Sequence, residues 1–247
     1  MSGVQLRFLG TGDAFGSGGR LHTSTFVRSA EGDLLVDCGP STLAAMRRAA
    51  LDPNTVDAIV LTHLHGDHFG GVPFLLMEAH YAIGRARPLL IAGPAGVEAA
   101  VARAHEALFP GTGALPFRFP LAYLEWQDGQ SAVAGPARVT PLPVRHSAVM
   151  PCYGLRIEVD GRILAFSGDT EWTEALIALS AGADLFVCEC LGFESAPPHH
   201  LDYRTIEAHR SALACRRLLL THMGEEMLAR AAELGADTAH DGLVVQV

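Results

Sequence analysis

The chain lacks the features of a membrane or exported protein. No apolar run approaches the ~20 residues that a membrane-spanning helix needs. The N-terminus has no basic segment followed by an apolar stretch, so we expect no signal peptide. Basic residues are also few, because 18 lysines and arginines stand against 27 aspartates and glutamates. The net charge of −9 at pH 7 disfavours a broad electrostatic surface for nucleic acid, although a local basic patch stays compatible with it.

Cysteine is scarce, and its spacing is not that of a disulfide scaffold. The five cysteines are Cys38, Cys152, Cys188, Cys190 and Cys215. Their odd number favours reduced thiols and a cytoplasmic location. Two of them alternate within the apolar run 185–190, so they would share one face of a strand. We expect that pair to be buried by packing, with metal binding as the less favoured alternative.

The chain has ample material for a core. Of its 247 residues 49% are hydrophobic and 18% are charged, and we expect a single domain over residues 1–247. The first half predicts strands at 4–9, 23–28, 33–37, 58–61 and 88–92, and helices at 41–50, 71–81 and 95–108. Ser41 is a plausible N-cap of the first helix.

The second half repeats this order of strands followed by βα units. Residues 117–144 are strand-like, and Asp160-Gly161 predicts a hairpin between strands 153–159 and 163–166. Strands at 185–190, 217–221 and 243–247 then alternate with helices at 171–180, 203–212 and 225–234. Two similar halves favour an α/β (α+β) fold, a four-layer αβ/βα sandwich of two mixed β-sheets flanked by helices.

A dense metal-binding motif follows the apolar strand 58–61. His63, His65, Asp67 and His68 place four metal-competent side chains within six residues. Imidazoles two residues apart in a turn can point at one centre, and the neighbouring carboxylate and third imidazole can serve a second. Three histidines with one aspartate suit zinc and its neighbours.

Three further metal-competent residues stand where predicted strands end. His146 follows strand-like residues 139–144, Asp169 follows 164–168, and His222 follows 218–221. Ligands at strand ends are held by a rigid scaffold while one side stays open to solvent. We therefore expect these residues to complete the site begun by the first motif.

This set of residues resembles the metallo-β-lactamase fold superfamily of binuclear hydrolases. The resemblance implies that His63, His65 and His146 hold one ion, that Asp67, His68 and His222 hold a second, and that Asp169 bridges both. It implies two divalent metal ions, zinc in the first place with manganese or iron as alternatives, and a metal-bridging hydroxide as the nucleophile. Asp67 would orient the bridging water or take its proton. No G-x-S-x-G elbow offers a serine nucleophile instead.

Departures from the best-known members indicate the branch. Zinc β-lactamases usually carry Cys where this chain has Asp169, and acyl-homoserine lactonases place a Tyr where it has Trp172. Ribonuclease Z-like enzymes carry a non-ligand histidine in the place of His200, where it meets the transition state or the leaving oxygen of a phosphodiester. Glu189 is the one match to their His-Glu-Ala-Thr segment, and the resemblance implies a supporting role for it.

The long arm with which ribonuclease Z grips transfer RNA has no room here. Asp169 lies only 23 positions after His146, and the predicted hairpin fills the interval. We therefore expect no long nucleic acid and no membrane as partner, but a small phosphodiester, cyclic ones included. A lactone or thioester hydrolase and a di-iron redox relative are the alternatives. A homodimer stays open, because dimers are common among relatives.

Two glycine-containing loops are candidates for the rim of the site. The loop 10–19 would lie beside the metals, with Asp13 and His22 as rim residues. Residues 109–116 are either a lid or a plain connection, and the sequence favours neither. Glu78 and His80 on the predicted helix 71–81 are expected to pack or to line a pocket wall, and not to bind metal.

Overall fold

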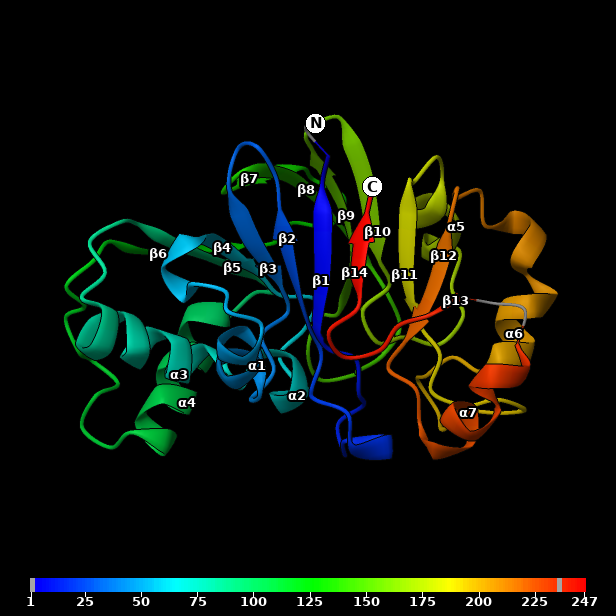
Figure 1. Cartoon of the computed structure of the whole chain (residues 1–247), viewed down its shortest axis with the longest axis horizontal. Coiled ribbons are helices and arrows are strands. Elements are labelled where there is room, and N and C mark those ends of the chain that lie inside the picture. Colours follow the sequence, from blue (N-terminus) through cyan, green and yellow to red (C-terminus); the bar gives the residue numbers. More distant parts are fainter. Residues whose placement is uncertain (1–2, 235–236) are drawn as a thin grey trace.

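The computed structural model describes residues 3–234 and 237–247, which form two sheets packed face to face (Figure 1). Each sheet has seven strands, in the orders β14-β1-β2-β3-β4-β5-β6 and β13-β12-β11-β10-β9-β8-β7. Both mix parallel and antiparallel pairs, and the predicted sandwich of two mixed sheets flanked by helices is confirmed. None of the helices in the described residues has both the length and the apolar character that crossing a membrane requires.

The first sheet is built mainly from the first half of the chain. Its strands are β1 (Gln5–Gly10), β2 (Ser24–Arg28), β3 (Asp33–Val36), β4 (Val56–Val60), β5 (Leu89–Gly93), β6 (Leu121–Glu125) and the C-terminal β14 (Val244–Gln246). The helices of this half are α1 (Thr42–Arg48), α2 (Gly66–Phe69), α3 (Val72–Met77) and α4 (Val97–Leu108). Strands β3 to β6 pair in parallel, so their carboxyl ends meet at one end of the sandwich.

The second sheet follows the same plan. Its strands are β7 (Ala132–Ala134), β8 (Ala137–Pro143), β9 (Tyr153–Val159), β10 (Arg162–Phe166), β11 (Leu185–Glu189), β12 (Leu218–Thr221) and β13 (Asp237–Thr238). Its helices are α5 (Ala175–Ser180), α6 (Tyr203–Ala208) and α7 (Glu225–Arg230). Strands β10, β11 and β12 are parallel, and their carboxyl ends reach the same end of the molecule as those of β3 and β4 (Figure 1).

Three apolar clusters separate the layers. The central cluster joins Leu6 and Val60 of one sheet to Ile157 and Leu219 of the other. The other two clusters lie between each sheet and its own helices. Cys188 and Cys190 are both buried in the outer cluster of the second sheet, as their alternation predicts. Because both sheets are fixed by apolar packing on either face, the loops at their shared end start from rigid positions.

The predicted two-residue hairpin is present. Arg162 pairs with Val159, and Asp160 and Gly161 have φ angles of 47° and 71°. Positive φ at both central residues is what a tight turn of this hand requires, and Asp-Gly tolerates it better than most dipeptides. The hairpin fixes β10, and with it the start of the segment that ends at Asp169.

Two local predictions hold only in part. The helix expected over 71–81 is present, but α3 ends at Met77 and its continuation, Glu78–Ile83, is a widened π-helical stretch that runs on to Gly84. This stretch delivers Arg85, whose buried guanidinium donates to backbone carbonyl oxygens, among them that of Val56. Ser41 stands at the N-cap position of α1, but its hydroxyl oxygen accepts the His22 amide instead of capping the helix.

Candidate metal centre

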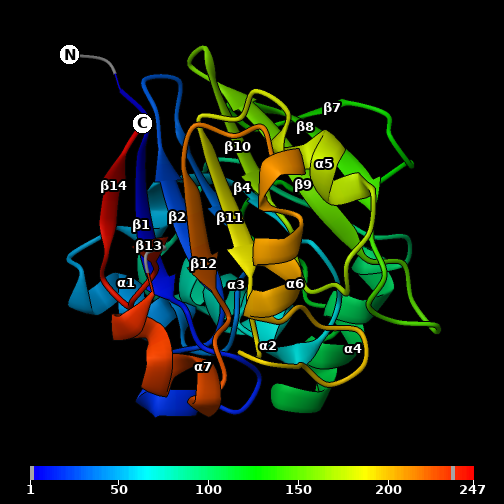
Figure 2. The same cartoon turned by 90° about the vertical axis from the view of Figure 1, so that its right-hand side faces the viewer.

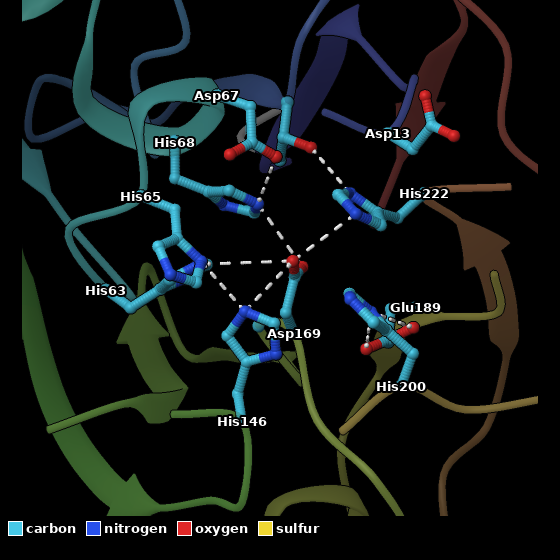
Figure 3. Close-up of polar contacts among 12 residues, drawn as sticks. Asp13, His63, His65, Asp67, His68, His146, Asp169, Glu189, His200 and His222 are labelled. Carbon is cyan, nitrogen blue, oxygen red and sulfur yellow. Dashed lines mark hydrogen bonds and ion pairs between the residues drawn. The ribbon is translucent and has the colours of Figure 1, made fainter. Parts of the chain in front are cut away.

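The metal-competent residues singled out from the sequence come together where the strands of both sheets end. The turn between β4 and α2 provides His63 and His65, and α2 itself provides Asp67 and His68. The segments after β8, β10 and β12 provide His146, Asp169 and His222. Figure 3 shows their side chains pointing toward a common centre.

Three imidazoles form the first donor group. The Nδ1 atom of His65 lies 3.1 Å from Nε2 of His63 and 2.9 Å from Nε2 of His146. Burial and the neighbouring His68 lower the pKa of His63 well below its usual value, and burial also lowers the pKa of His146. Neutral rings whose nitrogens converge in this way offer lone pairs to one cation.

The second donor group mixes carboxylates with imidazoles. The Nε2 atom of His68 lies 3.3 Å from Asp67 Oδ2 and 3.2 Å from Asp169 Oδ1. Nε2 of His222 lies 3.3 Å from Asp169 Oδ2. The donor atoms of these four residues all fall within 4.8 Å of one another.

Asp169 faces both groups. Its Oδ2 atom is also 3.7 Å from His146 Nε2 and 3.9 Å from His63 Nε2, so one carboxylate reaches from the second group to the first. Burial alone would raise the pKa of Asp169, but the imidazoles of His222 and His68 hold it well below its usual value. The carboxylate is therefore ionised, and it faces both donor groups.

The donors fit divalent cations. Nε2 of His68 is buried and has no hydrogen-bond partner, although two carboxylates flank it. A buried polar atom without a partner is costly, and a cation between this nitrogen and the carboxylates would satisfy it. Histidine nitrogens with aspartate oxygens are the ligands that zinc and its neighbours prefer.

The rings are oriented by contacts on their opposite nitrogens. In four of the histidines Nε2 faces the centre and Nδ1 meets an oxygen atom. The contacts are His63 with Thr62 Oγ1 at 3.1 Å, His68 with Asp37 Oδ2 at 2.7 Å, His146 with the His199 carbonyl oxygen at 3.0 Å, and His222 with Thr23 Oγ1 at 3.2 Å. Such partners fix the tautomer and direction of a metal-binding imidazole.

Asp37 contacts the candidate centre, although it was not singled out from the sequence. It is buried, and besides His68 its carboxylate accepts the backbone amide of Thr62 at 2.8 Å and the Thr62 hydroxyl at 2.9 Å. It therefore ties the turn before the metal motif to a ring of that motif. A signal was present, because Asp37 directly follows the apolar strand β3, just as Asp169 follows an apolar strand.

A second buried pair lies beside the donors. Nδ1 of His200 is 3.1 Å from Oε1 of Glu189, whose carboxylate also accepts the amides of Thr170 and Leu201 (Figure 3). Burial alone would lower the pKa of His200, but this hydrogen bond raises it, while burial raises the pKa of Glu189. Both shifts favour a proton held on this pair.

His200 also lies close to the first group of donors. One of its ring nitrogens falls within 4.8 Å of donor atoms of His146 and Asp169, so geometry alone allows it to bind a cation. Its Nδ1 atom is engaged by Glu189, which leaves Nε2 to face the cleft that His200 lines.

An open cleft of about 490 Å³ lies above the donors. Asp13 lines it, as expected of a rim residue, whereas His22 is set back, its backbone bridged to Gly12. Thr112–Leu115 line a different cavity of about 380 Å³ against α4, which favours a plain connection over a lid for this segment.

The remaining candidates on the first half have structural contacts. Nδ1 of His80 accepts the Arg118 amide, and Glu78 pairs with Arg47. Both contacts agree with the expectation that these residues pack.

Comparisons with known proteins agree with this geometry. A sequence profile described as "Beta-lactamase superfamily domain" matches residues 33–223. Ribonuclease Z of Methanothermobacter thermautotrophicus is 29% identical over 272 aligned positions, covering 89% of this chain and 86% of that protein. Ribonuclease Z of Mycobacterium tuberculosis is 31% identical over 191 positions, covering 74% and 68%.

Solved structures match along the whole chain. The short form of human tRNase Z superposes with a TM-score of 0.78 at 24% identity, covering 98% of both chains. A diphosphatase of the PhnP family superposes with a TM-score of 0.77 at 20% identity, covering 99% of this chain and 98% of that one. At these identities the superpositions show a shared fold.

Proposed function

This chain belongs to the β-lactamase superfamily, as a ribonuclease Z-like hydrolase of the metallo-β-lactamase fold, and we propose that it hydrolyses a small phosphodiester with two divalent cations. It is a metal-dependent hydrolase of the phosphodiesterase type. The proposal adds the number of cations, their ligands and the size of the substrate. The observation that carries it is the position of Asp169, whose carboxylate faces both donor groups.

We assign the ligands from the two groups. His63, His65 and His146 would hold one ion, while Asp67, His68 and His222 would hold the other, with Asp169 between them. Zinc fits this borderline-soft donor set first, with manganese or iron as alternatives. Bound cations of this kind polarise phosphoryl oxygens and lower the pKa of water, which supplies the nucleophile.

The protein's own groups would handle the protons. Although burial opposes it, His68 lowers the pKa of Asp67, so the Asp67 carboxylate is ionised and would orient the attacking water by accepting a hydrogen bond from it. His200, kept protonated by Glu189, would donate from Nε2 to the departing oxygen. The two roles need opposite protonation states, and the two environments supply them.

A small substrate is supported by the chain between His146 and Asp169. This interval is filled by β9, β10 and their two-residue turn, which leaves no length for an RNA-gripping arm. A cleft of about 490 Å³ falls within the usual size of small-molecule sites. Trp172, which stands where lactonases carry Tyr, has no hydroxyl group and stacks on His209 with ring centroids 3.9 Å apart, which weakens the lactonase alternative.

His200→Ala tests the assigned proton donor. We expect unchanged metal content and a fall in kcat of about 10²-fold or more on uridine 2′,3′-cyclic phosphate, whose ribose oxygen needs a proton to leave. The fall on bis-(p-nitrophenyl) phosphate should be smaller, because p-nitrophenolate leaves readily without one. Equal losses on both substrates, or none, would refute the role of His200.

A matched control is available next to it. His199 is exposed and has a positive φ of 71°, so His199→Asn removes an imidazole at a position where Asn tolerates the backbone. It should keep turnover of both substrates.

The alternative functions can be tested on the same metal-loaded sample. Faster turnover of lactones or thioesters than of phosphodiesters would overturn the proposed reaction. The absorption spectrum of a di-iron centre together with oxidoreductase activity would favour the redox alternative.

A further inference from the structure

One aromatic side chain at the cleft is almost fully open to solvent. Phe15 is 94% exposed, yet it lines the cleft above the metal donors. Burying a phenylalanine ring stabilises a protein, and the fold forgoes that stabilisation here. An exposed ring beside a candidate active site is therefore a candidate for contact with substrate.

We propose that Phe15 is a stacking platform that makes this cleft prefer phosphodiesters carrying a flat aromatic ring, a nucleobase above all. The inference rests on the proposed phosphodiesterase function and names the substrate class within it. Aromatic side chains stack on any base, because every base has a π-face. The platform would act by binding the group attached to phosphorus that does not leave.

The loop that carries Phe15 is held in place. Oδ1 of the buried Asp13 accepts the amides of Phe15 at 3.1 Å and Ser17 at 2.9 Å, and Oδ2 accepts the Ser17 hydroxyl at 2.6 Å. Asp13 itself lies beside His222 (Figure 3).

A second tie fixes the far end of the loop. The Gly18 amide donates to Oε1 of Glu225 at 2.8 Å, and the loop lies against α7 (Figure 2). Gly16 and Gly18 have φ angles of 69° and 63°, which glycine adopts without strain. The backbone that carries the ring therefore loses little conformational freedom when a ligand stacks on Phe15, so more of the stacking energy appears as affinity.

The charges around the platform favour a substrate with a single phosphate. The charged side chains among the described residues lining the cleft, histidines aside, are all carboxylates: Asp13, Asp67, Asp169, Glu225 and Glu226. Asp67 and Asp169 belong to the donor groups, but Glu225 and Glu226 are exposed on the first turn of α7. A second phosphate held near α7 would meet negative charge and no arginine or lysine of the lining.

The experiment compares substrates that share one leaving group. Thymidine 5′-(p-nitrophenyl phosphate) carries a base, and ethyl p-nitrophenyl phosphate does not. We expect the wild-type, metal-loaded protein to have the higher kcat/KM on the thymidine ester. Phe15→Ala should lower kcat/KM on that ester by about 5- to 150-fold, mostly through KM, and should change the ethyl ester by less than about twofold.

Two further variants separate stacking from a general effect. Phe15→Trp keeps a flat ring and should retain the preference for the thymidine ester. Val149→Ala truncates another apolar side chain, 91% exposed on the loop after His146, and should leave both substrates unchanged. Calorimetric titration with thymidine 5′-monophosphate gives a readout without turnover, in which Phe15→Ala should raise Kd by a similar factor.

A separate substrate tests the preference for a single phosphate. Adding a 3′-phosphate to the thymidine ester should lower kcat/KM, and Glu226→Gln should recover part of the loss, whereas Glu233→Gln at the exposed η5 turn, Ala231–Glu233, should not. Equal effects of Phe15→Ala on both esters, or no effect, would overturn the stacking platform while the phosphodiesterase function stands. If wild-type protein hydrolyses neither ester, the proposed function is wrong and the platform falls with it.

Discussion

The carboxylate of Asp37 offers the sharpest test of how the candidate metal centre is built. Its Oδ1 accepts the Thr62 amide at 2.8 Å, while Oδ2 accepts Nδ1–H of His68 at 2.7 Å. In Asp37→Asn the amide oxygen can keep the bond to Thr62, which leaves the NH₂ group facing His68. Nδ1 must then accept a hydrogen bond, and the ring proton moves to Nε2. That is the nitrogen that faces Asp67 and Asp169.

The size of the effect follows from this change of tautomer. Losing an orienting partner of a metal-binding histidine typically costs 10- to 100-fold in metal affinity, which is about 1.4–2.8 kcal/mol. Asp37→Asn blocks the donor atom as well as losing the partner, so we expect about 100-fold. The loss of metal affinity should be confined to the second donor group. The described side-chain hydrogen bonds of Asp37 go to Thr62 and His68, and none of them reaches a ring of the first group.

The assay is a stepwise calorimetric titration of chelator-treated protein with Zn²⁺. Asp33→Asn is the matched control, since Asp33 lies on the same strand β3 and pairs with Arg28, away from the centre. We expect two binding steps of wild-type affinity in the control, and one unchanged and one weakened step in Asp37→Asn. A folded Asp37→Asn protein that binds both ions with wild-type affinity would refute the argument.

Two further predictions concern stability and thiol reactivity. Burial alone would raise the pKa of Asp13, but its hydrogen bonds with Ser17 and Phe15 hold that pKa below the usual 3.8. The ionised Asp13 carboxylate therefore stabilises the fold above pH ~4, and this stabilisation is lost as the pH falls through the lowered pKa. Asp13→Asn should therefore lower the free energy of unfolding, measured in urea, by about 1–2 kcal/mol at pH 7. The difference in this free energy between wild-type and variant protein should become smaller below pH ~4, and a difference that does not change with pH would contradict this prediction. Burial raises the pKa of Cys152 to about 11 and that of Cys38 to about 12, and Cys188 and Cys190 are also buried, whereas Cys215 is half-buried. At pH 8 an aromatic disulfide reagent should titrate Cys215 first and the other four thiols only after unfolding, and rapid reaction of several thiols in the native protein would show the burial to be wrong.

Much of the fold could be predicted because its signals are local. The apolar run 185–190 became β11, Leu185–Glu189, and the Asp160-Gly161 turn joins the two strands expected around it. Each signal depends on a few consecutive residues, which is the range over which periodicity and turn chemistry act.

The short helix α2 could not be predicted in this way. Its four residues, Gly66–Phe69, are too few for helix formation on their own. It is held from outside, because the Cys38 amide donates to the His68 carbonyl oxygen at 2.6 Å. At Gly39 any side chain would collide with the Asp67 carbonyl oxygen, so the close approach requires glycine there. These contacts join segments about 30 residues apart, and no local pattern records them.

The metal-competent side chains could be predicted from the sequence, but the residues that orient their rings could not. A histidine or aspartate shortly after an apolar strand marks a strand end: His222 directly follows β12, and His63, His146 and Asp169 stand three residues after β4, β8 and β10. Which oxygen meets the second nitrogen of each ring depends on how the rings turn once packed. Thr23 and Thr62 carry no feature that separates them from other threonines of the chain, so their contacts with His222 and His63 emerge only in three dimensions.

The backbone conformation at two strand ends also shapes the site, and the sequence did not predict it. Asp37 and His222 have φ angles of 57° and 56°, a left-handed conformation that costs most residues about 1–2 kcal/mol. Each stands immediately after its strand, β3 or β12, and each amide is bonded there, Asp37 to the Val60 carbonyl oxygen at 2.9 Å and His222 to that of Thr11 at 3.1 Å. At both positions the chain turns out of the sheet within one residue while the side chain enters the centre, as a donor at His222 and as a support at Asp37. Glycine would relieve the strain but would remove the imidazole or the carboxylate, and strain of this kind persists where the surrounding contacts over-determine it. The left-handed backbone at Asp37 and His222 therefore lowers stability, but it directs both side chains from the ends of rigid strands toward the candidate centre.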